Sequence, residues 1–77
     1  MGRDIFYLRA WVWRDQAREY EPDRIAEFET YEEANAELRT LRLTPDIPCV
    51  ELYRASVNKY RCEEGDELLG KRELYGL

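Results

Sequence analysis

The stretch from Ile5 to Trp13 alternates between two unlike sets of side chains, and it constrains the fold more than any other segment. Successive side chains of a β-strand point to opposite faces of a sheet. One face of this strand is wholly apolar, and it carries Phe6, Leu8, Ala10 and Val12. The other face is aromatic with one charge, and it carries Tyr7, Arg9, Trp11 and Trp13. Only one face can line the core of the domain, so the other face needs a different cover.

The N-terminal third of the chain predicts a β-hairpin. Residues 4–14 are rich in aromatic and β-branched types, which favour a pleated, half-buried strand. The polar segment over residues 14–23 ends in a Pro-Asp pair, which predicts a long hairpin loop. Residues 24–30 form the second strand, and we expect one of its glutamates to lie opposite Arg9 and pair with it.

A helix follows over about residues 30–43. Thr30 and Glu33 have the spacing of a capping box, which marks a helix start. Apolar residues at helical spacing predict the buried stripe, which consists of Ala34, Leu38 and Leu41. The prolines at positions 45 and 48 cannot continue the helix, so it ends by Leu43.

The C-terminal part predicts at least one more strand. Residues 49–55 alternate in the same way as the first strand, and they add Tyr53 to the aromatic face. Residues 57–77 leave two alternatives open, a C-terminal hairpin that turns at about residues 63–66 or a partly ordered tail.

These elements predict one small α+β domain that spans residues 1–77. Its antiparallel sheet has three to five strands with one helix packed on one face, in the order β-β-α-β with the possible added hairpin. A chain of 77 residues buries only a small core, and self-association is a common remedy.

Charge and residue content narrow the functional class. The formal net charge is −5, and residues 19–37 hold eight acidic and one basic side chain, which disfavours direct binding to nucleic acid. The sequence has no histidine, no glycine-rich phosphate loop and no G-x-S-x-G motif, so we expect no enzyme and no catalytic residue. Cys49 and Cys62 match no metal-ligand spacing, so we expect no metal site and no cofactor.

Targeting signals are also missing from the sequence. It shows no segment apolar enough for a signal peptide or a membrane span, which favours a cytoplasmic protein with two reduced thiols and no membrane partner.

The aromatic face is therefore the candidate site, and its predicted partner-binding residues are Tyr7, Arg9, Trp11, Trp13 and Tyr53. Tyrosine, tryptophan and arginine are the types most enriched in binding hot spots. Three covers are open: the chain's own tail through its late leucines and Tyr75, a second copy, or a different protein. We expect a non-enzymatic interaction module that forms a homodimer through this face.

An alternative function rests on the acidic segment. Its carboxylates could occupy a basic nucleic-acid-binding surface, which predicts a decoy or inhibitor of such a protein, as some phage-type accessory proteins are. The seven residues from Phe28 to Ala34 resemble the strand-to-helix junction of the N-terminal arm modules of phage-type integrases. Those modules are basic, whereas this chain is acidic at the same place, so we do not assign the family.

Overall fold

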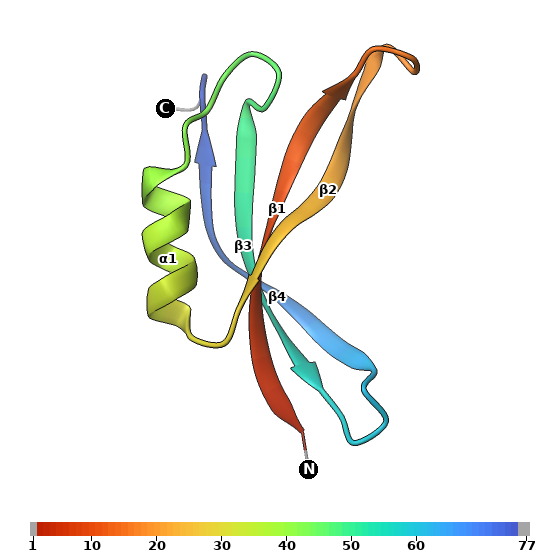
Figure 1. The fold of residues 1–77 in the computed structure, drawn as a ribbon, viewed down its shortest axis with the longest axis vertical. Helices are drawn as coiled ribbons and strands as arrows, with labels where there is room; N and C mark the ends of the chain where they lie inside the picture. Colours follow the sequence, from red (N-terminus) through yellow and green to blue (C-terminus); the bar gives the residue numbers. More distant parts are fainter. Residues whose placement is uncertain (1, 76–77) are drawn as a thin grey trace.

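The computed structural model describes residues 2–75 and contains one helix and four strands. In chain order they are β1 (Arg3–Arg14), β2 (Glu19–Phe28), α1 (Tyr31–Thr40), β3 (Cys49–Val57) and β4 (Glu63–Glu73). The strands form a single antiparallel sheet in the order β2-β1-β3-β4, and α1 lies against one face of it (Figure 1). The predicted α+β fold with one helix on an antiparallel sheet is confirmed.

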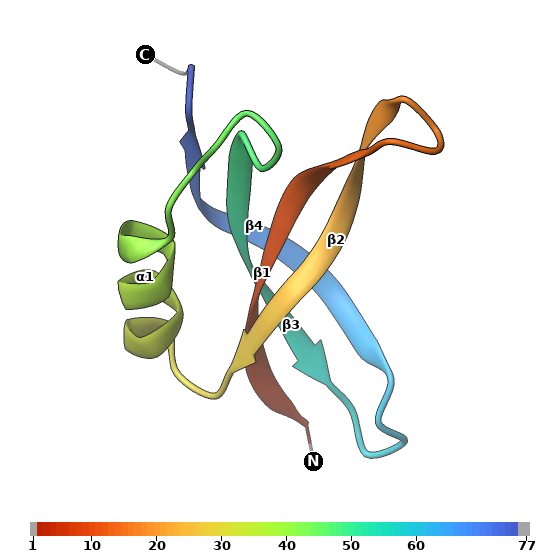
Figure 2. The same cartoon turned by 45° about the horizontal axis from the view of Figure 1, so that its top comes forward.

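The sheet is strongly twisted, so its two hairpins cross one another as an X in both views (Figures 1 and 2). The pairing of β1 with β2 continues to Arg14 opposite Glu19, whereas the pairing of β1 with β3 stops at Trp11 opposite Cys49. The tip of the first hairpin therefore projects beyond β3.

The main core lies between α1 and the sheet. Leu8 of β1 faces Leu52 of β3 in the register, and both side chains are fully buried. Ala34 and Leu38 of α1 complete this layer from the helix side. Burial of each leucine side chain stabilises the fold by about 1.5–3 kcal/mol. The apolar face predicted for the first strand is therefore the face that packs against the helix.

The helix begins as predicted but ends earlier. Thr30 is the N-cap, and its hydroxyl oxygen accepts a hydrogen bond from the Glu33 N–H at 3.2 Å. The last helical residue is Thr40, because Leu41 has an extended backbone with ψ of 129°. The helix therefore ends by Leu43 as predicted, three residues short of the approximate range of 30–43.

Arg72 of β4 closes the C-terminal end of α1. Its Nη1 donates to the carbonyl oxygens of Leu38 and Leu41, at 2.5 and 2.8 Å. These carbonyls have no partner within the helix, and a cation there also complements the helix dipole. This contact joins the last strand to the end of the helix, and no sequence pattern predicted it.

The predicted long loop in the first hairpin is wrong. Only residues 15–18 form the turn, and β2 already begins at Glu19. Arg18 takes a positive φ of 54°, and its N–H donates to the Arg14 carbonyl at 2.7 Å, which closes the turn in four residues. Pro22 is tolerated inside β2 because this is an edge strand, where one missing N–H need not interrupt the sheet.

The register of the first hairpin also differs from the expectation for Arg9. The pairing of β1 with β2 is irregular between Leu8 and Arg9. As a result Arg24 lies opposite Arg9, and the predicted glutamate does not. Arg9 instead forms its ion pair with Glu51 of β3. A bulge changes the register by one residue, and no sequence pattern located it here.

The C-terminal segment resolves the open alternative in favour of a hairpin. β4 pairs with β3, but the turn spans residues 58–62, so the predicted turn at 63–66 is wrong. The side-chain oxygen of Asn58 accepts from the N–H groups of Tyr60 and Cys62 and thereby organises this turn. Residues 76 and 77 of the predicted segment lie outside the described residues.

Within residues 2–75, no helix has the length and apolar character that crossing a membrane requires.

Candidate functional site

The sheet face away from α1, called the open face below, carries all five predicted partner-binding residues. They are Tyr7, Arg9, Trp11 and Trp13 on β1 and Tyr53 on β3. The register sets Tyr7 opposite Tyr53, and their rings stack with centroids 5.4 Å apart. The structure divides this face into three parts with different degrees of cover.

The part around Tyr7 is closed within the single chain. Arg24 of the edge strand β2 lies over the Tyr7 ring, with its Cζ 3.7 Å from the ring centroid. Its two terminal nitrogens each donate to one carboxylate oxygen of Glu63, at the start of the other edge strand, at 2.8 Å. This Arg24–Glu63 bridge spans the open face from edge to edge and leaves Tyr7 only 3% exposed. Tyr7 is therefore a packing residue that a partner cannot reach directly.

A second small apolar cluster lies under the bridge. Ile5 and Ala55 are buried there together with Tyr7. Burial raises the pKa of the Tyr7 hydroxyl, and the nearby Asp66 carboxylate raises it further. The sequence could not reveal this cover, because Arg24 and Glu63 are 39 positions apart and stand in segments predicted as a strand start and a turn.

The middle of the open face is polar, and its positive and negative charges compensate one another. Arg9 Nη2 lies 3.3 Å from Glu51 Oε1, and the same nitrogen donates to the Tyr53 hydroxyl at 2.5 Å. Glu51 is only 8% exposed, so its charge depends on Arg9 for compensation. Arg9 and Tyr53 are thus brought together as predicted, but they are already engaged with each other.

The remaining part lies at the turn end of the first hairpin, where Trp11 is the last β1 residue paired with β3 and Trp13 lies on the projecting tip. We call Trp11, Trp13, Tyr20 and Pro22 the tryptophan surface. Tyr20 packs edge-on against Trp13 with centroids 5.0 Å apart, and its hydroxyl donates to the Pro45 carbonyl at 2.7 Å. The Trp13 indole N–H donates to Asp15 at 2.7 Å.

Both indole rings of the tryptophan surface are nevertheless only partly buried, and Tyr20 is 43% exposed. Tyr20 and Pro22 were missed by the sequence analysis because they fall in the segment predicted as a loop. Alternation continued through residues 19–22 would have placed them on this face.

The chain's own tail does not cover the tryptophan surface. Leu69 packs against the core on the helix side of the sheet, so it faces away from the tryptophans. Leu68, Leu74 and Tyr75 are 50%, 37% and 74% exposed. The predicted alternative in which these residues shield the tryptophans is therefore wrong, although Leu68 lies opposite Tyr53 on the open face. The other shielding of this face comes from Arg24, Glu63 and Tyr20.

Charged residues of both signs border the tryptophan surface on β4. In the sheet register, Glu73 of β4 lies opposite Cys49 of β3, and Cys49 lies opposite Trp11 of β1. Lys71 precedes Glu73 by two residues and is therefore on the same face of β4. Lys71 Nζ contacts the Glu73 carboxylate at 2.6 Å. Cys49 is a free thiol whose pKa is raised by burial, so it is a packing residue rather than a reactive one.

No group of three or more histidine, cysteine, aspartate or glutamate side chains in residues 2–75 is arranged to hold a metal ion. No protein-family model matches the sequence, and neither a curated protein nor a solved structure matches it. The functional argument therefore rests on the chain's own geometry.

Proposed function

We propose that this chain is a non-enzymatic interaction module that forms a homodimer through the tryptophan surface. One observation carries the proposal: the chain covers the Tyr7 end of its open face and leaves Trp11, Trp13 and Tyr20 partly exposed. Aromatic side chains give large contact area at low entropic cost, and they dominate the energetic centre of interfaces.

The border of the surface favours a second copy as the partner. Interfaces of two-fold symmetry are self-complementary, so a patch bordered by both signs of charge can meet its own copy. Lys71 and Glu73 provide both signs on β4, which is separated from Trp11 by β3.

The test is the double substitution Trp11→Ser and Trp13→Ser, measured by light scattering over a range of protein concentrations. We expect a dimer for the native chain and a monomer for the variant, with unchanged helix content by circular dichroism. The matched control is Tyr60→Ser with Tyr75→Ser, which removes the two most exposed aromatic side chains from outside this surface. A native chain that stays monomeric at every concentration would refute self-association.

A second candidate function is favoured by the exposure of the acidic segment. Glu27, Glu29, Glu32, Glu33 and Glu37 are all exposed. Such a surface supports a decoy that binds a basic nucleic-acid-binding protein by electrostatic attraction. Binding should then weaken steeply between low and high salt and be lost in a variant with Glu29, Glu32 and Glu37 changed to Lys. Glu33 is left in place because its carboxylate accepts the Thr30 hydroxyl at the helix cap.

A further inference from the structure

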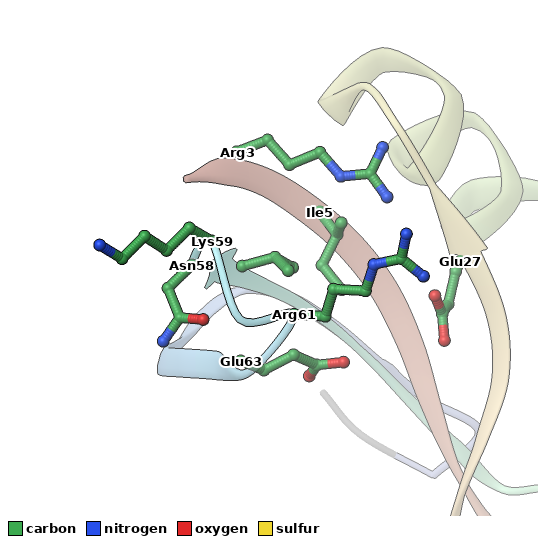
Figure 3. Close-up of a pocket in the computed structure, with 8 residues that line it drawn as sticks. Arg3, Ile5, Glu27, Asn58, Lys59, Arg61 and Glu63 are labelled. Atoms are coloured by element: carbon green, nitrogen blue, oxygen red, sulfur yellow. The ribbon is translucent and has the colours of Figure 1, made fainter. Parts of the chain in front are cut away.

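The end of the open face farthest from the tryptophan surface contains a hollow of about 610 Å³ (Figure 3). It lies between the start of β1, the strand β2 and the turn that joins β3 to β4. Arg3, Lys59 and Arg61 line it, and Ile5 and Val57 supply apolar surface. The Lys59 ammonium extends away from the two arginines (Figure 3) and lies 5.2 Å from the centroid of the Tyr60 ring. Arg3 is eight residues from Trp11 along β1, which corresponds to about 26 Å.

Two of these cations have no carboxylate partner in the described part of the chain. Neither Lys59 nor Arg61 takes part in an ion pair within residues 2–75, although the protein has 17 acidic and 12 basic side chains. Arg3 approaches only Glu29, at 3.9 Å, and both side chains of that pair are more than two-thirds exposed. A pair of this kind contributes little and gives way easily to a better ligand.

The carboxylates that line the hollow are already engaged. Glu27 and Glu63 both contact the guanidinium of Arg24, at 3.3 and 2.8 Å. Counting the ion-pair partners Arg24 and Glu29 with the lining residues, the region holds four cations against three carboxylates, a net charge of +1 in a protein whose net charge is −5. The hollow is thus a locally positive site on an acidic protein, and its own acidic groups do not neutralise it.

Arg61 belongs to the turn between β3 and β4 and lines this site. Arg61 has a positive φ of 63°, a conformation that is uncommon for residues other than glycine. Figure 3 shows its guanidinium extending into the hollow toward the side of Glu27, opposite the turn that carries it. Guanidinium groups are planar donors that match the oxygens of carboxylates and phosphates.

We propose that this hollow binds the anionic group of a small organic ligand, a phosphate monoester or a carboxylate. Arg61 and Arg3 donate hydrogen bonds to its oxygens, and its apolar part lies on Ile5 and Val57. The volume falls within the roughly 300–1,000 Å³ of small-molecule sites and exceeds what a bare ion needs. The site is separate from the tryptophan surface, so a monomeric variant retains it.

The test is a titration of the labelled protein with phenyl phosphate, benzoate and phenol, followed by two-dimensional NMR at constant ionic strength. We expect saturable shifts of the amides of residues 3–5 and 57–63 with an anionic probe and none with phenol. A tenfold preference for phenyl phosphate assigns the site to phosphate esters, and the reverse preference assigns it to carboxylates. Shifts that fail to saturate by about 10 mM, or that phenol reproduces, would overturn the proposal.

A matched pair of variants distinguishes specific binding in the hollow from non-specific electrostatic attraction of the anion to the protein. Arg3→Gln with Arg61→Gln should weaken binding at least tenfold. Arg39→Gln with Arg42→Gln removes the same charge from two exposed arginines at the end of α1, and it should change binding less than twofold. Equal losses in the two variants would show that only net charge matters and would also overturn the proposal. Native-like peak dispersion of each variant establishes that it is folded.

Discussion

The Arg24–Glu63 bridge predicts a measurable coupling between the two edge strands. Both nitrogens of the Arg24 terminus donate to separate oxygens of Glu63 at 2.8 Å, and the two side chains are 33% and 35% exposed. A fully exposed pair is worth about 0.2–1 kcal/mol, and a two-bond geometry with partial burial lies at the upper end. We expect a coupling energy of about 1 kcal/mol.

The single substitution Arg24→Met should cost more than this coupling. It also removes the cation above the Tyr7 ring, which is worth about 0.5–1 kcal/mol, and the contact with Glu27. We therefore expect a loss of about 2 kcal/mol, and each kcal/mol lowers Tm by roughly 4–8 °C in a domain of this size.

The assay is a double-mutant cycle with Arg24→Met and Glu63→Gln, measured by urea unfolding and tryptophan fluorescence. A cycle isolates the Glu63 contribution from the other contacts of Arg24. The exposed pair of Arg14 with Asp23, which has one contact at 2.8 Å, serves as the control, with about 0.3 kcal/mol expected. A coupling between Arg24 and Glu63 no larger than this control would refute the argument that the bridge closes the face.

Two further predictions concern acid and the helix start. The hydrogen bond from Arg24 lowers the pKa of Glu63, so the stability from this bridge is present above the ordinary glutamate value of 4.5 and is lost as the pH falls through the lowered pKa. The difference in urea midpoint between the native chain and Glu63→Gln, clear at pH 7, should therefore shrink as the pH falls below 4.5; a difference that acid leaves unchanged would contradict it. Thr30→Ala removes the acceptor for the Glu33 N–H and should lower the free energy of unfolding by about 1 kcal/mol in the same urea assay, whereas an unchanged midpoint would show that this cap contributes nothing.

Much of the fold follows from local patterns in the sequence. The alternation around Leu8 and Leu52 identified the two strands at the centre of the sheet and the face that meets the helix. The Thr30–Glu33 cap located the helix start to within one residue. The turns were harder, because the four-residue turn at 15–18 and the Asn58 turn depend on backbone conformations such as the positive φ of Arg18.

The candidate site was predicted only in part. The alternation of side chains along each strand placed all five aromatic-face residues on one side of the sheet, and the structure agrees. It could not show that Tyr7 is closed off while Trp11 and Trp13 stay partly exposed, since that difference depends on residues from both edge strands. The basic hollow was missed for the same reason, because Arg3 and Arg61 meet only when β1 and the turn after β3 come together.

By itself, the sequence determined a two-faced sheet with a helix on its apolar side, because strand alternation and helix capping act between residues a few positions apart. The tertiary structure alone decided which half of the other face stays accessible. The twist of the sheet brings Arg24 and Glu63 together across 39 residues, and contacts at that separation leave no periodic trace in the chain.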